Sequence, residues 1–424
     1  AVMSVGYICG PRISSYMFAG GIISWLVLIP AIVLFGSDLT LYPGTAPIGE
    51  MFASGGASAI WGSYIRYIGA GALAAGGIIS LIKSLPLIVR TFRDALKSMN
   101  GTKEGGNVRT NQDLNMKIIL VAIAILTILV WLLPQIPVSL LGAVIVVIFG
   151  FFFATVSSRM VGLVGSSNNP VSGMAIATLL IATIILKATG DSGIHGMQGA
   201  IAIGSIICIV AAIAGDTSQD LKTGYLLGAT PKKQQIGEII GVIAAGLAIS
   251  GVLYLLDSAW GFGTEQLGAP QAMLMKMIIE GVMNNNLPWA LVFIGVFLAI
   301  AAEVVGIPVL PFAIGVYLPV QLNACIMVGG LIRLGFEKSK KEKKDKERMI
   351  SDGMLYCSGM IAGEGIVGIL LALFAVFKID EVIDLSGKLN LSEPVATIGS
   401  LVVFALIILL VLKFSFWKKK KESK

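Results

Sequence analysis

Long apolar runs separated by short polar segments recur along the whole chain. Each run has roughly 20 residues, the length that an α-helix needs to cross a hydrocarbon core of about 30 Å. A transmembrane β-barrel would instead show short segments in which apolar and polar positions alternate. The pattern therefore predicts an all-α polytopic membrane protein with about 10–12 transmembrane helices. The expected spans are residues 14–35, 57–82, 117–133, 138–156, 171–187, 197–214, 236–256, 289–306, 309–334, 353–377 and 396–412.

Composition agrees with a chain that lies mostly in lipid. Hydrophobic residues make up 56% of the 424 residues and charged residues only 13%, against about 25% charged in soluble domains. The net charge of +7 comes mainly from loops and the tail. No basic run is interleaved with aromatic residues, which argues against a nucleic-acid partner. The four cysteines are scattered without a Cys-x-x-Cys spacing, so neither a disulfide framework nor a metal site is expected.

The distribution of Lys and Arg predicts which loops face the cytoplasm, because cytoplasmic loops carry an excess of both. The basic segments are residues 83–117, residues 335–352 and the tail at 414–424. We therefore expect a single transmembrane domain at 1–413, with a cytoplasmic carboxyl terminus. The chain starts without an initiator Met, on residues typical of the end of a packed helix. We accordingly expect further spans before it.

Eleven spans, an odd number, would put the two ends of the chain on opposite sides of the membrane. Arg12 and the tail, however, both belong on the cytoplasmic side. We place the conflict in 257–334, where Pro308, Pro311 and Pro319 interrupt helical hydrogen bonding. A re-entrant or broken helix there would restore the parity, and many transporters build midplane sites from such helices. A short repeat, SYMFAG at 15–20 and SGMIAG at 358–363, has two equally supported interpretations, a duplicated body and chance similarity in a sequence rich in Gly and Ala.

One polar stretch stands out between two apolar runs, AGDTSQDLKTGYLLGATPKKQQIG at 214–237. Carboxylates are costly to bury in a membrane, so two of them beside hydroxyl groups suggest the wall of a cavity. An equally supported interpretation is a solvated cytoplasmic loop, with Thr217 or Ser218 capping a helix. The candidate residues of this stretch are Asp216, Thr217, Ser218, Asp220 and Lys222.

A second polar patch, SSNNPVSGM at 166–174, precedes an apolar run. Asn168, Asn169 and Ser172 there would lie at a helix amino terminus, whose free N–H groups suit a substrate carboxylate. An ordinary loop followed by a capped helix explains the same residues. Glu303 and Glu364 are isolated carboxylates in apolar runs, and such residues usually face a cavity, a proton path or a partner. For Glu364, the alternative is a protonated side chain bonded to a neighbouring helix.

The remaining sequence features concern helix packing and other classes of function. The glycine pairs Gly237/Gly241 and Gly359/Gly363 predict close helix packing. No phosphate-binding loop is present, so direct ATP drive is unsupported. An intramembrane aspartyl protease is disfavoured, because Ile213 stands where the Gly-x-Gly-Asp signature needs glycine. A passive channel or scaffold remains as a further alternative.

Three blocks make the sequence similar to the oligopeptide transporter (OPT) family, in its prokaryotic and yellow-stripe-like branch. They are NNPVSGM at 168–174, AGDTSQDLKTGYLLGATP at 214–231 and IPVLPFAIGVYLPVQLNACIMVGG at 307–330. GPRISSYMFAGG at 10–21 and SGMIAGEG at 358–365 agree as well. Members of this family usually have additional amino-terminal spans, which is consistent with the expectation that spans precede this chain.

The resemblance implies a secondary transporter for small peptides or amino-acid-derived metal chelates in the cytoplasmic membrane. It implies a proton gradient as the energy source and no bound cofactor, and it leaves the oligomeric state open, with a homodimer as one option. For proton coupling the candidates are, in order of expected burial, Glu364, Glu303 and Asp216. For the substrate path they are Asn168, Asn169, Ser172, Asp216, Thr217, Ser218, Asp220 and Lys222.

Overall fold

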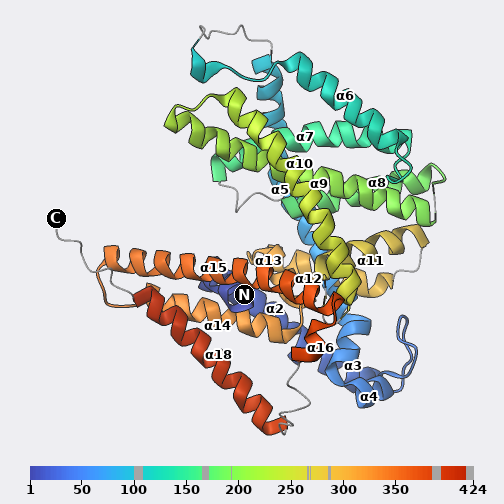
Figure 1. The fold of residues 1–424 in the computed structure, drawn as a ribbon. Helices are drawn as coiled ribbons and strands as arrows, with labels where there is room; N and C mark the ends of the chain where they lie inside the picture. Colours follow the sequence, from blue (N-terminus) through green and yellow to red (C-terminus); the bar gives the residue numbers. More distant parts are fainter. Residues whose placement is uncertain are drawn as a thin grey trace, which may run out of the picture. The chain divides into compact units, whose positions relative to one another are not determined.

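The computed structural model describes residues 1–99, 108–164, 171–191, 193–264, 267, 269–284, 288–383 and 393–416. All regular structure in these ranges is helical, and they contain no β-strand (Figure 1). Eight helices of the described ranges are long and apolar enough to cross a membrane. The prediction of an all-α polytopic membrane protein is therefore confirmed.

The chain packs into two compact units. Unit 1 comprises residues 1–72, 251–268 and 297–424, and unit 2 comprises residues 73–250 and 269–296. The helices of unit 1 are α1 (Val2–Cys9), α2 (Pro11–Ile22), η1 (Ile23–Leu28), α3 (Ile29–Gly36), α4 (Ile48–Ile60), η2 (Trp61–Ile65), α13 (Val309–Tyr317), α14 (Val320–Glu337), α15 (Lys343–Val376), α16 (Ile379–Ile383) and α18 (Glu393–Phe416). Those of unit 2 are η3 (Arg109–Asn111), α6 (Met116–Leu132), α7 (Leu140–Val164), α8 (Val171–Ala188), α9 (Ile194–Leu227) and α11 (Pro270–Asn284). Three helices contribute residues to both units, namely α5 (Arg66–Met99), α10 (Pro231–Trp260) and α12 (Trp289–Val304).

Several helices run further than their apolar runs predict. α5 continues through Met99, so half of the basic segment expected as a loop is helical. α15 begins at Lys343, which leaves only a short connection after α14. Lys and Arg are good helix formers, and a charged extension can leave the membrane without ending the helix. Apolar length therefore locates a span but not the ends of its helix.

The proline-rich region after α12 is broken, as the sequence predicts. α12 ends before Gly306, which has a positive φ of 81°. α13 follows with nine residues and ends where Leu318 and Pro319 become extended. Nine helical residues reach only about 14 Å, too short to cross a hydrocarbon core of about 30 Å. The expected single span at 309–334 is therefore two helices, and the expected break is confirmed.

Glycines bring the backbones of unit 1 into contact at two helix crossings. α1 packs against α14, and α2 packs against both α13 and α14. A Cβ atom added to any of four glycines here would overlap a carbonyl oxygen of the partner helix. Small residues let helices approach in this way, which favours van der Waals packing in lipid. The four are Gly6, Gly20, Gly315 and Gly329.

The glycine pairs chosen from the sequence do not make such contacts. A Cβ added at Gly237, Gly241, Gly359 or Gly363 would meet nothing within 4 Å. The prediction that these pairs are helix-packing contacts is therefore wrong within the described residues. Spacing alone did not distinguish a glycine on a packed face from one on an open face.

Candidate functional site

The polar stretch at 214–237 is largely helical. α9 continues through Leu227, so Thr217 and Ser218 lie inside the helix and cap no helix end. Ser218 Oγ donates to Ala214 O at 2.8 Å and lies 2.5 Å from Ser158 Oγ of α7. The interpretation as a capped loop is therefore wrong, and this stretch packs against a neighbouring helix of unit 2.

The turn at 228–230 between α9 and α10, here called the elbow, forms for local reasons. Gly228 ends α9 in a left-handed conformation, with a φ of 72°. Ala229 N donates back to Gly224 O at 2.8 Å, which is the bond that commonly closes a helix at such a glycine. Pro231 then starts α10, because a proline at the first helical position loses no hydrogen bond.

Polar side chains from both arms of the elbow meet. Gln234 Nε2 of α10 donates to Asp220 O at 3.2 Å and lies 3.4 Å from Asp220 Oδ2. Glu238, one helical turn further along α10, interacts with both Thr217 and Asp220. Two of the predicted path residues are thus brought together with two α10 residues that the sequence analysis did not select.

The segment before α6 binds the elbow directly. Arg109 donates from Nη1 to Thr230 Oγ1 at 3.1 Å and from Nη2 to Gly228 O at 2.8 Å. Leu114 N donates to Gln235 Oε1 at 2.9 Å. The elbow and the end of the basic segment at 83–117 therefore lie on the same side of unit 2.

The other predicted path residues are less connected to this cluster. Lys222 lies with Nζ 5.1 Å from the ring centre of Tyr225 on its own helix, within the range of a cation–π contact. Asp216 is exposed. Two predicted residues, Asn168 and Asn169, lie outside the residues that the structure describes. For Ser172 the structure describes the backbone but not the side chain.

The structure changes the order of burial among the three coupling candidates. Glu364 of α15 exposes 62% of its side chain, and Asp216 is also exposed. Glu303 near the end of α12 is half-buried. Burial therefore places Glu303 first rather than Glu364, while the coupling role of each remains a prediction.

Asn323 holds the break between α13 and α14 in unit 1. The Gly315 carbonyl would accept a bond from residue 319 if the helix continued, but Pro319 has no N–H. Asn323 Nδ2 donates to Gly315 O at 2.8 Å instead, and to Leu318 O at 3.3 Å. Asn323 is fully buried, and its Oδ1 has no hydrogen-bond partner among the described residues. Gly21 of α2 packs against this side chain.

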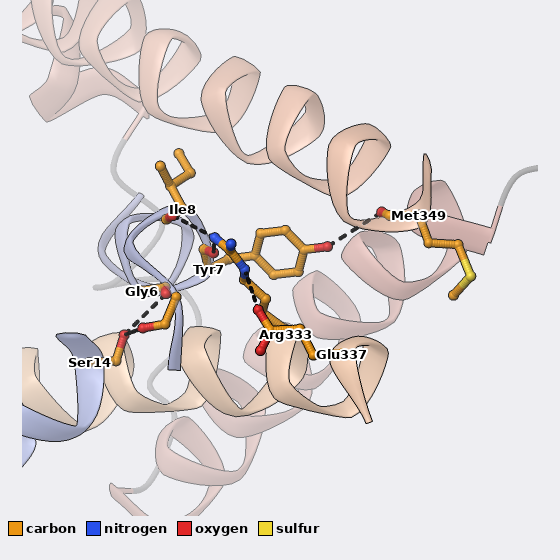
Figure 2. A network of polar contacts seen from close by, with 8 residues as sticks. Gly6, Tyr7, Ile8, Ser14, Arg333, Glu337 and Met349 are labelled. Atoms are coloured by element: carbon orange, nitrogen blue, oxygen red, sulfur yellow. Dashed lines mark hydrogen bonds and ion pairs between the residues drawn. The ribbon is translucent and has the colours of Figure 1, made fainter. Parts of the chain in front are cut away.

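A second break separates α1 from α2 at Gly10, whose φ is 86°. Arg333 of α14 donates from Nη1 to Tyr7 O at 3.2 Å and to Ile8 O at 2.7 Å, as Figure 2 shows. Its Nε also pairs with Glu337 at 3.0 Å. The guanidinium thus satisfies carbonyls that α1 leaves open at its carboxyl end, where the helix dipole favours a positive charge.

Unit 2 also contains an apolar cavity of about 330 Å³ between α8, α9 and α11. Leu179, Ile201, Cys208 and Met275 are among its lining residues. This mainly apolar lining is unsuited to a metal ion. Within the described ranges, no group of three His, Cys, Asp or Glu residues could hold one.

The sequence analysis did not select four polar residues that contact other helices or helix ends in the structure: Gln234, Glu238, Asn323 and Arg333. Gln234 and Glu238 stand four residues apart, a spacing that places both on one face of a helix. Arg333 and Asn323 lie in a helix otherwise rich in apolar and small residues. An intramembrane polar residue is a functional candidate by default, and this signal was available for Arg333 and Asn323.

Long apolar helices, two helix breaks and polar side chains gathered at an elbow define a polytopic membrane protein of the transporter type. Residues 1–375 match the family described as OPT oligopeptide transporter protein. The chain belongs to this family, which confirms the resemblance drawn from the three sequence blocks. Members of the family are transporters rather than enzymes.

The chain is also similar to individual curated proteins. It is 29% identical over 419 residues to the "Putative oligopeptide transporter" of Haemophilus influenzae, across 88% of this chain and 65% of that protein. It is 26% identical over 263 residues to the "Putative oligopeptide transporter YGL114W" of Saccharomyces cerevisiae, across 57% and 35%. It is 30% identical over 210 residues to the "Probable metal-nicotianamine transporter YSL14" of rice (Oryza sativa subsp. japonica), across 44% and 28%. The chain thus spans at most 65% of the length of these three relatives.

Proposed function

We propose that this chain forms the body of a secondary active transporter that moves small peptides or amino-acid-derived metal chelates across the cytoplasmic membrane. The observation that carries the proposal is the family match over residues 1–375. Relatives named for oligopeptides and for metal–nicotianamine complexes support the two substrate classes. Both classes carry carboxylate and amine groups, so one kind of polar path suits either.

A proton gradient is the proposed energy source, and no bound cofactor is part of the proposal. One charge moving across 100 mV gains about 2.3 kcal/mol, enough to concentrate a substrate about fiftyfold at equilibrium. The coupling group must be protonatable and must alternate between the two sides. Glu303 is the first candidate because it is half-buried in an apolar helix, followed by Glu364 and Asp216.

We place the elbow at the cytoplasmic end of the path. Arg109 ties it to the basic segment at 83–117, and Lys232 and Lys233 add two positive charges beside it. Positive loops favour the cytoplasmic side. Thr217, Asp220, Gln234 and Glu238 would then meet the substrate as it leaves the membrane.

Uptake into proteoliposomes tests the proposal. The purified protein is given a labelled dipeptide and an iron–nicotianamine complex, each with and without an inward-acid pH gradient. We expect gradient-driven accumulation of one of them above its external concentration. Equilibration without accumulation would indicate a passive channel, and no uptake by folded protein would contradict the transport proposal.

The coupling residue is tested by pH-dependent uptake of variants. Glu303→Gln should abolish accumulation while leaving exchange of internal for external substrate intact, since exchange needs no net proton movement. Glu364→Gln is the matched comparison at the more exposed position. Unchanged accumulation in Glu303→Gln would eliminate Glu303 as the coupling group.

A further inference from the structure

Two short π-helical segments of unit 1 meet through their tryptophans. η1 continues α2, and η2 continues α4. Trp25 of η1 stacks on Trp61 of η2, with ring centres 6.4 Å apart and an angle of 29° between the planes. π-helical turns are rare and occur frequently at functional sites, because they re-aim side chains at a cost in backbone stability.

A positive charge lies beside this tryptophan pair. The Arg66 guanidinium carbon is 5.8 Å from the ring centre of Trp61, within cation–π range. Arg66 is half-buried, and the described residues provide it with no carboxylate partner. Cation–π attraction orients the guanidinium but leaves its N–H groups to find acceptors elsewhere.

Three hydrogen-bond donors of this cluster have no acceptor in the part of the chain that the structure describes. Trp25 Nε1, Trp61 Nε1 and Arg66 Nε are buried, and none has a hydrogen-bond partner among the described residues. Buried donors are normally paired, and each exception in a folded protein requires an explanation. Three exceptions in one contact cluster, all donors and one of them cationic, leave this cluster with unmatched hydrogen-bond donors.

The sequence positions of Trp25 and Arg66 place both residues within apolar segments. Trp25 falls near the middle of the apolar helix at Pro11–Gly36. Arg66 is the only charged residue of the apolar run at 57–82. A charged residue within a membrane span generally marks a substrate or ion pathway. A Cβ added at Gly62, the residue after Trp61, would meet nothing within 4 Å.

We propose that Trp25, Trp61 and Arg66 form a binding site for the carboxylate of the transported substrate. A carboxylate is an acceptor-only group that takes several hydrogen bonds. Arginine matches its planar geometry, and tryptophan offers a donor without a competing acceptor. The inference rests on the proposed function, because the carboxylate belongs to the peptide terminus or to the chelator that is carried.

The test compares substrates that differ only in the carboxylate. Uptake by proteoliposomes is measured for alanyl-glycine and alanyl-glycinamide. The wild-type protein should prefer the acid form of whichever substrate it carries. Because a hydrogen bond to a charged group is among the stronger ones, we expect a preference of roughly tenfold to a hundredfold in kcat/KM.

Variants then remove the donors one at a time. Trp25→Phe and Trp61→Phe keep an aromatic ring but delete an N–H, and each should reduce the preference by roughly tenfold. Arg66→Met keeps much of the side-chain length and should bring the acid-to-amide ratio close to one, whereas Arg66→Lys should retain part of it. The ratio is taken on one folded variant at a time, so a loss of stability or yield cancels from it.

Matched controls are available in the same chain. Trp289→Phe alters a tryptophan of unit 2 that packs on Phe293. Arg12→Met alters an arginine of unit 1 that contacts a tyrosine ring. Both should leave the acid-to-amide ratio unchanged.

The outcomes distinguish failure of the carboxylate site from failure of the proposed transport function. An unchanged ratio in the two Trp→Phe variants and in Arg66→Met would overturn the carboxylate site while leaving the transport function intact. If Arg66→Met does not fold, the acid-to-amide ratios of the two Trp→Phe variants decide whether the carboxylate site exists. No uptake of any substrate by the folded wild-type protein would contradict the proposed function, and the carboxylate site would fall with it.

Discussion

Replacing Gly69 with alanine tests whether the backbone contacts of unit 1 determine its stability. Gly69 of α5 is buried against α13, and an added Cβ would lie 2.6 Å from Tyr317 Cα and 3.0 Å from Tyr317 N. Ordinary contact begins near 3.4 Å, so the two helices must separate by close to an ångström. Overpacking of this kind costs about 1–3 kcal/mol. We expect the upper part of this range, because the atoms met are backbone atoms that cannot rotate away.

The same change on an open helix face provides the control. Gly237→Ala in α10 adds a Cβ that meets nothing within 4 Å, and alanine gains about 1 kcal/mol over glycine in a helix interior. Gly69 is also helical, so this gain is common to both variants, and they should differ by the overpacking cost of about 1–3 kcal/mol. Thermal unfolding in detergent would show a lower melting temperature for Gly69→Ala and an equal or higher one for Gly237→Ala. Equal melting temperatures for both variants would refute the reasoning.

Three further predictions concern polar contacts that fix helix ends. Asn323→Leu should destabilise the protein by about 1–3 kcal/mol, measured by the same melting assay, because the Gly315 carbonyl loses its donor in a buried site. Arg333→Met should expose α1 to limited proteolysis, because the carbonyls of Tyr7 and Ile8 lose their partner; protection equal to wild type would contradict this role. Arg109→Met should speed hydrogen exchange of amides around Gly228 and in the segment before α6, and exchange at wild-type rates would show that Arg109 does not hold the elbow.

Much of the fold follows from apolar run length, because the lipid core demands long helices with satisfied backbones. The break near Pro319 could be predicted for the same reason, since a proline removes a donor from the helical ladder. The break between α1 and α2 was not predicted. It depends on Gly10 adopting a positive φ, and glycine occurs too often in this sequence for each one to indicate a turn.

The elbow shows why site prediction succeeded only in part. The hydrogen-bonding residues of α9 stand out in the sequence because they follow an apolar run directly, and Thr217 and Asp220 do face a polar cluster. Their partners Gln234 and Glu238 follow a Thr-Pro turn and a basic pair, so they resemble ordinary surface residues. Only the hairpin geometry of α9 and α10 brings the two groups together.

The burial of a charged residue cannot be assigned from its apolar neighbours in the sequence alone, as Glu364 and Arg66 of unit 1 illustrate. Glu364 follows the rule that an isolated charge in a span is a functional candidate, yet its side chain is largely exposed. Arg66 satisfies the same rule as the only charge of its apolar run, and it lies over Trp61, which stacks on Trp25. Neither indole N–H has an acceptor among the described residues. The rule therefore identifies which residues to examine, whereas the unmatched donors around a residue indicate what it binds. For Arg66 those donors are the basis of the proposed carboxylate site, which the acid-to-amide ratio tests.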